Sequence, residues 1–292
     1  MHNTVQFEEG EYGKKAIVRS EWKSSYLELL KSHDIAELEL NTGKGWRGSN
    51  VDFLRYFDTL QSIIIIDQRL KSLDPIHALV DLRECVLLTY GKHAVDFSVF
   101  PHLVSCSFDW INGSESLFET HSLRYLFVDC YSGRDSEIFK NLNQLNDLSI
   151  LNSKLPDLNG IRNLVHLRRL RIGNLRDLSS LAFVQNFSRL TELEINQCKK
   201  ITSIKEVFNL VNLQKLFLLE MGTIDTIEGI EKLKNLSEFI FYGATNIADG
   251  NLEPILALSM LKKISFMNRR HYTSKREEFD AYPGGKTLDS FS

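Results

Sequence analysis

One short apolar pattern recurs along the chain and limits what it can fold into. An aliphatic or similar apolar residue occupies the first, fourth and sixth positions of each segment, as in Leu145, Leu148 and Ile150. Successive segments begin 20 to 25 residues apart, a spacing typical of chains built from stacked structural repeats. Eleven segments follow this pattern, beginning at Ile35, Leu60, Leu82, Leu103, Leu123, Leu145, Leu167, Leu190, Leu213, Leu236 and Leu261.

The spacing within each repeat predicts its local structure. Apolar residues at positions 4 and 6 bury one face of a short strand, and positions 2, 3, 5, 7 and 8 face out from the sheet. Apolar residues then recur at every third position, as in Ile201, Ile204, Val207 and Leu210, which fits a 3-10 or short helical return. A single repeat cannot bury its own leucines, so neighbouring repeats must stack and share one core.

This pattern resembles that of the leucine-rich-repeat superfamily over about residues 35–268. The resemblance implies an α/β leucine-rich-repeat solenoid, a curved horseshoe with a parallel sheet on the concave face and short helical, 3-10 or irregular segments on the convex face. The family usually has Asn or Cys at position 9, and this chain has Cys198 there in one repeat but Ser153 and Met221 in others. The segments TNIADGNLEPIL (245–256) and NRRHYTSKREEF (268–279) resemble leaderless bacterial members, some of which act as partners or antidotes of toxins.

The ends of a stacked core need covers, because the last repeat would otherwise expose its apolar face to water. Residues 20–32, with Trp22, Tyr26, Leu29 and Leu30 among their apolar side chains, predict an amphipathic capping helix. We therefore expect three parts: an N-terminal segment and capping helix (1–34), a solenoid of about eleven repeats (35–268), and a C-terminal cap or tail (269–292).

Composition narrows the functional classes. The net charge of −3 offers no basic field for nucleic acid, and no apolar run approaches the roughly 20 residues that span a membrane. No H-E-x-x-H, G-x-S-x-G or Walker loop is present, and no cofactor or metal is expected. Few cysteines and no basic leader before an apolar core predict a cytoplasmic protein, and we expect it to be a monomer. The four cysteines, none at metal-ligand spacing, are Cys85, Cys106, Cys130 and Cys198.

A glycine-rich loop supports an alternative, a dinucleotide-binding enzyme. Gly43–Gly48 reads G-x-G-x-x-G after an expected strand, and Asp67 follows the third glycine by 19 residues, where a dinucleotide fold places its ribose-binding acid. However, Trp46 puts bulk where a pyrophosphate would approach, and no later segment completes a doubly wound sheet. We favour a loop that extends an early repeat.

Charged residues of alternating sign occupy position 3 in the later repeats. In-register neighbours on parallel strands would pair, which predicts a solvated charge ladder rather than a nucleic-acid site. Position 5 adds Arg171 beside Glu194. The ladder residues are Asp147, Arg169, Glu192, Lys215, Glu238 and Lys263.

Apolar side chains at outward positions indicate a binding surface, since a face that met only water would be polar. The early repeats carry Ile64, Ile66, Val86 and Leu88 there, although strand propensity or cover by the chain's own N-terminus would also explain them. We predict a non-enzymatic scaffold or regulator, toxin antidotes included, that grips another protein; a self-assembling structural module is a further alternative. The predicted partner-binding residues are Asp109, Trp110, Phe127, Asp129, Phe217, Leu219, Glu220, Ile240 and Tyr242.

Overall fold

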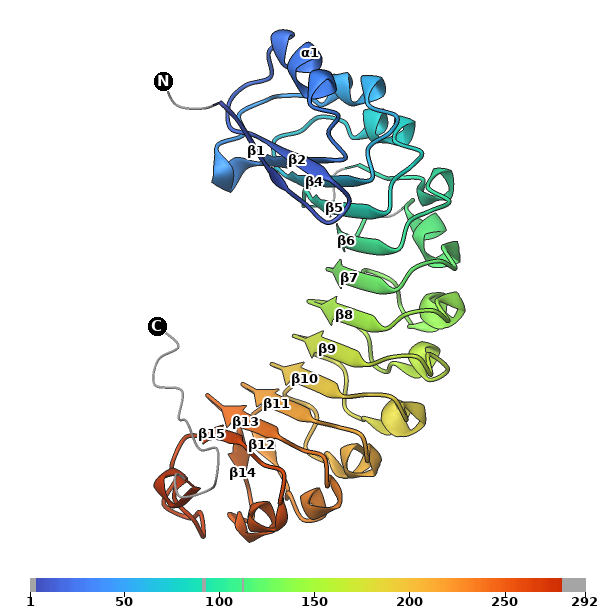
Figure 1. Cartoon of the computed structure of the whole chain (residues 1–292). Coiled ribbons are helices and arrows are strands. Elements are labelled where there is room, and N and C mark those ends of the chain that lie inside the picture. Colours follow the sequence, from blue (N-terminus) through green and yellow to red (C-terminus); the bar gives the residue numbers. More distant parts are fainter. Residues whose placement is uncertain (1–3, 91–92, 112, 280–292) are drawn as a thin grey trace. The chain divides into compact units, whose positions relative to one another are not determined.

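The computed structural model describes residues 4–90, 93–111 and 113–279. They form two compact units, which divide between Tyr131 and Ser132. In both units each repeat contributes one strand of a sheet and then returns through a short 3-10 helix (Figure 1). All eleven strands that the repeat pattern predicts are present, so the predicted architecture of stacked repeats with a parallel sheet is confirmed.

The sheet of unit 1 contains a hairpin followed by five repeat strands. The hairpin strands pair antiparallel, and the second of them adds in parallel to the first repeat strand. The repeat strands are parallel and in register, so equivalent repeat positions lie side by side. The strands are β1 (Val5–Glu9), β2 (Lys14–Val18), β3 (Glu37–Asn41), β4 (Ser62–Ile66), β5 (Glu84–Leu88), β6 (Ser105–Asp109) and β7 (Tyr125–Asp129).

The return segments of unit 1 are short, as the three-residue apolar spacing predicts. Each 3-10 helix of five residues buries two side chains, or a proline and one side chain, against the core. They are η1 (Thr42–Lys44), η2 (Asp52–Tyr56), η3 (Asp74–Ala78), η4 (Phe97–Val99) and η5 (Glu115–Glu119), preceded by the helix α1 (Ser25–Ser32).

The N-terminal cover is a helix together with a hairpin. Tyr26 and Leu30 of α1 are buried as expected, and Trp22 stacks on Phe53 with ring centroids 3.4 Å apart. The expectation for Leu29 is wrong, because this side chain lies on the exposed side of the helix. The hairpin was not predicted, and it covers the edge of the first repeat strand that a helix alone would leave unpaired.

Two glutamates fasten the hairpin to β3. The backbone N–H of Tyr12 donates to Glu37 over 2.6 Å, and Lys15 and Lys44 each lie 2.9 Å from the carboxylate of Glu39. Burial raises the pKa of Glu39, but the hydrogen bonds from the two lysines outweigh it and leave the pKa below its ordinary value. This buried glutamate is therefore charged and paired.

The sheet of unit 2 contains six parallel, in-register strands. A second, two-stranded pair, β12 (Thr223–Ile224) and β14 (Asn246–Ile247), replaces part of the irregular return. The sheet strands are β8 (Asp147–Leu151), β9 (Arg169–Gly173), β10 (Glu192–Asn196), β11 (Lys215–Leu219), β13 (Glu238–Tyr242) and β15 (Lys263–Phe266).

Short 3-10 helices line the other layer of unit 2 as well. The last of them places Phe279 against Phe266, with ring centroids 5.8 Å apart, and so covers the final repeat. Residues 280–292 of the predicted C-terminal cap lie outside the described residues. The helices are η6 (Glu137–Asn141), η7 (Asn159–Ile161), η8 (Ala182–Asn186), η9 (Lys205–Asn209), η10 (Ile230–Lys232), η11 (Glu253–Ala257) and η12 (Arg276–Phe279).

The core lies between the sheet and the 3-10 layer in each unit. Residues at repeat positions 4 and 6 are buried, as Leu193 and Leu216 illustrate, so the predicted inward register is confirmed. Cys85 and Cys106 occupy position 4 on neighbouring strands, and burial raises the pKa of both thiols. These two cysteines therefore act as small core residues.

Candidate functional site

The open face of each sheet, defined as the face formed by repeat positions 3, 5 and 7, lies opposite the 3-10 layer. In unit 1 this face carries Ile64, Ile66, Val86 and Leu88, which are all partly exposed. The β1–β2 hairpin pairs with the edge strand β3, so within the described residues it does not bury these four side chains. Unit 1 thus presents an apolar surface to the solvent.

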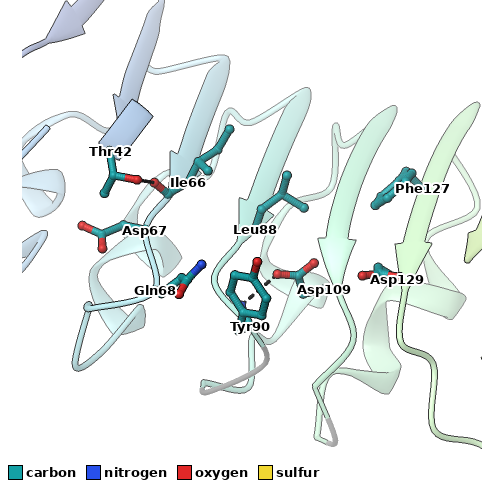
Figure 2. A pocket seen from close by; sticks show the side chains of 9 residues that line it. All are labelled: Thr42, Ile66, Asp67, Gln68, Leu88, Tyr90, Asp109, Phe127 and Asp129. Carbon is teal, nitrogen blue, oxygen red and sulfur yellow. Dashed lines mark hydrogen bonds between the residues drawn. The ribbon is translucent and has the colours of Figure 1, made fainter. Parts of the chain in front are cut away.

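A hollow of about 290 Å³ lies on the open face of unit 1, where strands β4 to β7 end (Figure 2). Three predicted site residues, Asp109, Phe127 and Asp129, line it together. Its lining also includes Tyr90, whose exposed fraction is 69%, and this residue was missed because it stands at position 9, outside the strand. The apolar wall is formed by Ile66 and Leu88.

The acidic side of the hollow has a perturbed carboxyl group. Asp109 accepts a hydrogen bond of 2.8 Å from the backbone N–H of Tyr90 and lies in register with Asp129 on the next strand. Burial, and secondarily the charge of Asp129, raises the pKa of Asp109. Asp67 differs, because Arg69 binds both of its oxygens at 3.0 and 2.9 Å and brings its pKa below the ordinary value despite burial.

The expected position of Trp110 is corrected by the structure. Its exposed fraction is only 8%, and its ring contacts those of Tyr131 and Phe118 at centroid distances of 4.9 and 5.5 Å. At the same repeat position, Cys130 and Gln197 have left-handed backbones with φ of 57° and 54°, whereas Trp110 does not. With this different backbone the indole lies in the core and is not offered to a partner.

Unit 2 has a second apolar patch on its open face. Phe217 pairs in register with Ile240, and Leu219 with Tyr242. Tyr242 is 49% exposed, and Phe217 and Leu219 are partly exposed. The expectation for Ile240 is wrong, since neighbouring side chains reduce its exposed fraction to 6%.

Glu220, predicted at the same patch, has a structural contact. Its carboxylate accepts a 2.9 Å hydrogen bond from the N–H of Ala244 in the turn of the next repeat. Its own backbone is left-handed, with φ of 53°. Glu220 therefore helps to hold two successive turns together, beside the exposed ring of Tyr242.

The charge ladder of unit 2 is confirmed except at one step, because Lys215 and Glu238 lie in register without forming an ion pair. Arg169 bridges Asp147 at 2.6 Å and Glu192 at 3.7 Å, Lys215 lies 3.4 Å from Glu192, and Lys263 pairs with Glu238. At position 5, Arg171 donates to Glu194 over 2.9 Å. Arg169 and Arg171 are thus bound to carboxylates on neighbouring strands.

The glycine-rich loop lacks the geometry of a dinucleotide site. The N–H of Gly43 donates to the Asn41 side chain, and the N–H of Gly45 donates to the carbonyl of Thr42. The buried ring of Trp46 lies against Gly48, where an added Cβ would come within 2.0 Å of it. These amides therefore bind the chain itself instead of forming an open anion cradle. The described residues also contain no group of three or more His, Cys, Asp or Glu side chains that could hold a metal ion.

Comparison with known proteins identifies the fold. No family model matches the sequence, and no curated protein matches it. An internalin, InlF of Listeria monocytogenes, is 25% identical, with a TM-score of 0.64 over 85% of this chain and 71% of its own. The functional domain of InlJ from the same organism, which includes a cysteine ladder, is 18% identical with a TM-score of 0.57 over 80% of this chain and 54% of its own.

The leucine-rich repeat domain of the type III effector XopL is also similar, at 16% identity and a TM-score of 0.53, over 72% of this chain and 77% of its own. The chain therefore has the leucine-rich-repeat fold, and its structural neighbours include bacterial repeat proteins. In the part of the chain that the structure describes, no helix is both long and apolar enough to cross a membrane.

Proposed function

We propose that this chain is a non-enzymatic protein-binding module that holds a partner protein on the open face of its sheet. The observation that carries the proposal is the set of apolar and aromatic side chains that remain partly exposed at outward positions of both units. An exposed apolar face lowers the solubility of a protein unless a partner covers it. Contiguous exposed apolar patches therefore commonly mark interaction sites.

The chemistry of the two patches fits protein recognition. Each combines aromatic side chains with carboxylates nearby, Phe127 and Tyr90 with Asp109 in unit 1, and Tyr242 with Glu220 in unit 2. Aromatic anchors beside polar groups are the usual composition of energetically important interface residues. The basic residues of the open face in unit 2 are engaged in ion pairs, which disfavours nucleic acid as the partner.

A regulator that clamps another protein, such as the antidote of a toxin, is the more specific form of this proposal. We place it in the cytoplasm, because all four cysteines are free thiols and thiols persist in reducing compartments. We also propose that it is a monomer. Gel filtration tests the alternative of a self-assembling module: we expect the elution volume of a 33.6 kDa monomer.

The proposal is tested by capture of a partner from the native host on immobilised protein, followed by variants. Phe127→Ala and Tyr242→Ala should each weaken capture at least about tenfold, because truncation of such anchors typically costs about 2 kcal/mol or more. Val165→Ala and Val211→Ala are matched controls, since both side chains are exposed outside the sheet. If the controls abolish capture while the open-face variants bind normally, the proposal is wrong.

A further inference from the structure

The hollow of unit 1 joins two kinds of surface in a small volume. Ile66 and Leu88 form an apolar wall, the rings of Tyr90 and Phe127 lie at its sides, and the carboxylates of Asp109 and Asp129 form its acidic side (Figure 2). Pockets for whole cofactors or drug-sized ligands have volumes of about 300–1,000 Å³. At about 290 Å³ the hollow is at the lower end of that range, and it has room for one long side chain of a partner.

Two carboxylates face each other on the acidic side of the hollow. Asp109 and Asp129 are directly opposite each other on adjacent parallel strands, whose spacing is about 4.8 Å. Like charges that face each other across strands are unfavourable, and burial increases this cost. Among the described residues, the groups that act on the Asp109 carboxyl are Asp129 and the backbone N–H groups of Tyr90 and Thr89, none of which is a cation.

We propose that this hollow receives an arginine side chain of the partner protein, with the guanidinium group between Asp109 and Asp129 and the methylene stem against Leu88 and Ile66. The inference rests on the proposed function, and it specifies the chemistry that the partner presents to unit 1. The positive charge relieves the repulsion between the carboxylates, and the stem covers apolar surface that otherwise contacts water.

Arginine fits better than lysine for two reasons. Its planar fork of N–H donors can bridge two carboxylates held at strand spacing, whereas an ammonium group is a compact point charge. A guanidinium plane also stacks on aromatic rings, which Tyr90 and Phe127 supply at the sides of the hollow. Lysine would gain charge neutralisation without the fork or the stacking.

The test is a nuclear magnetic resonance titration of the isotope-labelled full chain with acetyl-arginine amide. We expect saturable shifts at the amides of Tyr90, Asp109 and Asp129, with a Kd on the order of millimolar, as for one buried side chain. Acetyl-citrulline amide has nearly the same shape but no charge, and it should bind at least about tenfold more weakly. Acetyl-lysine amide should bind severalfold more weakly than acetyl-arginine amide. Equal binding of either control, or shifts confined to other surfaces, would overturn the inference.

The double variant Asp109→Asn/Asp129→Asn provides the matched test on the protein. The Asp109→Asn change keeps a side-chain oxygen that can accept the N–H of Tyr90, so the turn retains its hydrogen bond, and circular dichroism checks that the fold is intact. This variant should bind acetyl-arginine amide at least about tenfold more weakly, while Asp177→Asn, which removes a carboxylate of unit 2, should bind it normally. Wild-type affinity in the double variant would contradict the inference.

Partner capture separates this inference from the proposed function. Capture that depends on Tyr242 but is unchanged by the double variant overturns the arginine site and leaves the proposed function intact. Capture that no open-face variant weakens overturns both. Capture that the double variant weakens, with an effect that shrinks as salt is added, supports both.

Discussion

The two units use the same repeat but differ in what they place on the open face. In unit 2, position 3 carries charges of alternating sign, and Arg169 with its neighbours Asp147 and Glu192 forms a continuous ladder. In unit 1 the same position carries no such alternation, and Ser62 instead donates a 2.7 Å hydrogen bond to Glu84. Much of the charge on the unit 2 face is thus neutralised within the chain.

Position 5 and position 7 show the same contrast. In unit 1 the strands β4 and β5 carry aliphatic side chains there, and β6 and β7 end in the facing carboxylates Asp109 and Asp129. In unit 2 the ion pair of Arg171 with Glu194 precedes the apolar patch. The repeat pattern thus constrains the inward residues and leaves the outward ones free for function. The face of unit 1 combines exposed apolar area with negative charge, so a partner can bind it through apolar contacts and a positively charged group.

The largest expected difference between the units concerns position 8. Trp110→Ala removes a buried indole from unit 1 and should lower the free energy of unfolding by about 3–5 kcal/mol, because it leaves a large cavity. Gln197→Ala, at the same repeat position of unit 2, changes an exposed side chain and should cost about 0.5 kcal/mol or less. Urea unfolding followed by circular dichroism measures both, and equal losses would mean that Trp110 is not a core residue.

A smaller effect tests the ladder of unit 2. Lys215→Glu places a third carboxylate between Glu192 and Glu238 on the neighbouring strands and should cost on the order of 1 kcal/mol. The loss should shrink as salt is added, because exposed charges are screened. Lys205→Glu, the same change on an exposed residue of η9, is the control and should have little effect. A loss that does not depend on salt would indicate a packing defect instead of a ladder.

The smallest effect is a difference in pH dependence between Asp109 and Asp177. The pKa of Asp109 is raised by burial and by Asp129, so its charged form destabilises the fold and this cost grows as pH rises from the unfolded value of about 3.9 through the folded pKa. Asp109→Asn should therefore gain stability relative to wild type as pH rises through that window.

Asp177 should behave in the opposite way. The hydrogen bond from Lys200 lowers its pKa, so the stability that it contributes is present above the unfolded pKa and is lost as pH falls through the folded value. Asp177→Asn should lose stability relative to wild type as pH rises. Thermal unfolding at a series of pH values measures both variants, and slopes of the same sign would refute this contrast.

The strands and core could be predicted from the sequence because every repeat restates the same inward positions. The ladder could also be predicted, because the register of parallel strands follows from the repeat period, as Asp147 and Arg169 show. The β1–β2 hairpin could not be read from the repeat, since it precedes the first one. Its signal was the alternation of apolar and polar residues from Val5 to Glu8, followed by the turn residues Gly10 and Gly13, where Gly13 adopts a φ of 140°.

The site was harder to predict because it depends on contacts between repeats. Trp110 lies in the core with a backbone that differs from those of Cys130 and Gln197 at position 8, and no residue pattern reveals this difference. Ile240 is buried on a face where the pattern predicts exposure, and its cross-strand neighbour Phe217 supplies part of the cover. Tyr90 was missed because it follows the strand and reaches the hollow from the turn.

Side-chain footprinting with hydroxyl radicals shows whether the partner binds on the open face of the sheet. In the free protein, Tyr90 and Tyr242 on the open face and Tyr56 and Met260 outside the sheet are all exposed and should all be oxidised. In the complex with the captured partner, we predict that oxidation falls severalfold at Tyr90 and Tyr242 and is unchanged at Tyr56 and Met260. Protection of Tyr56 and Met260, with Tyr90 and Tyr242 oxidised as in the free protein, would show that the partner does not bind on the open face.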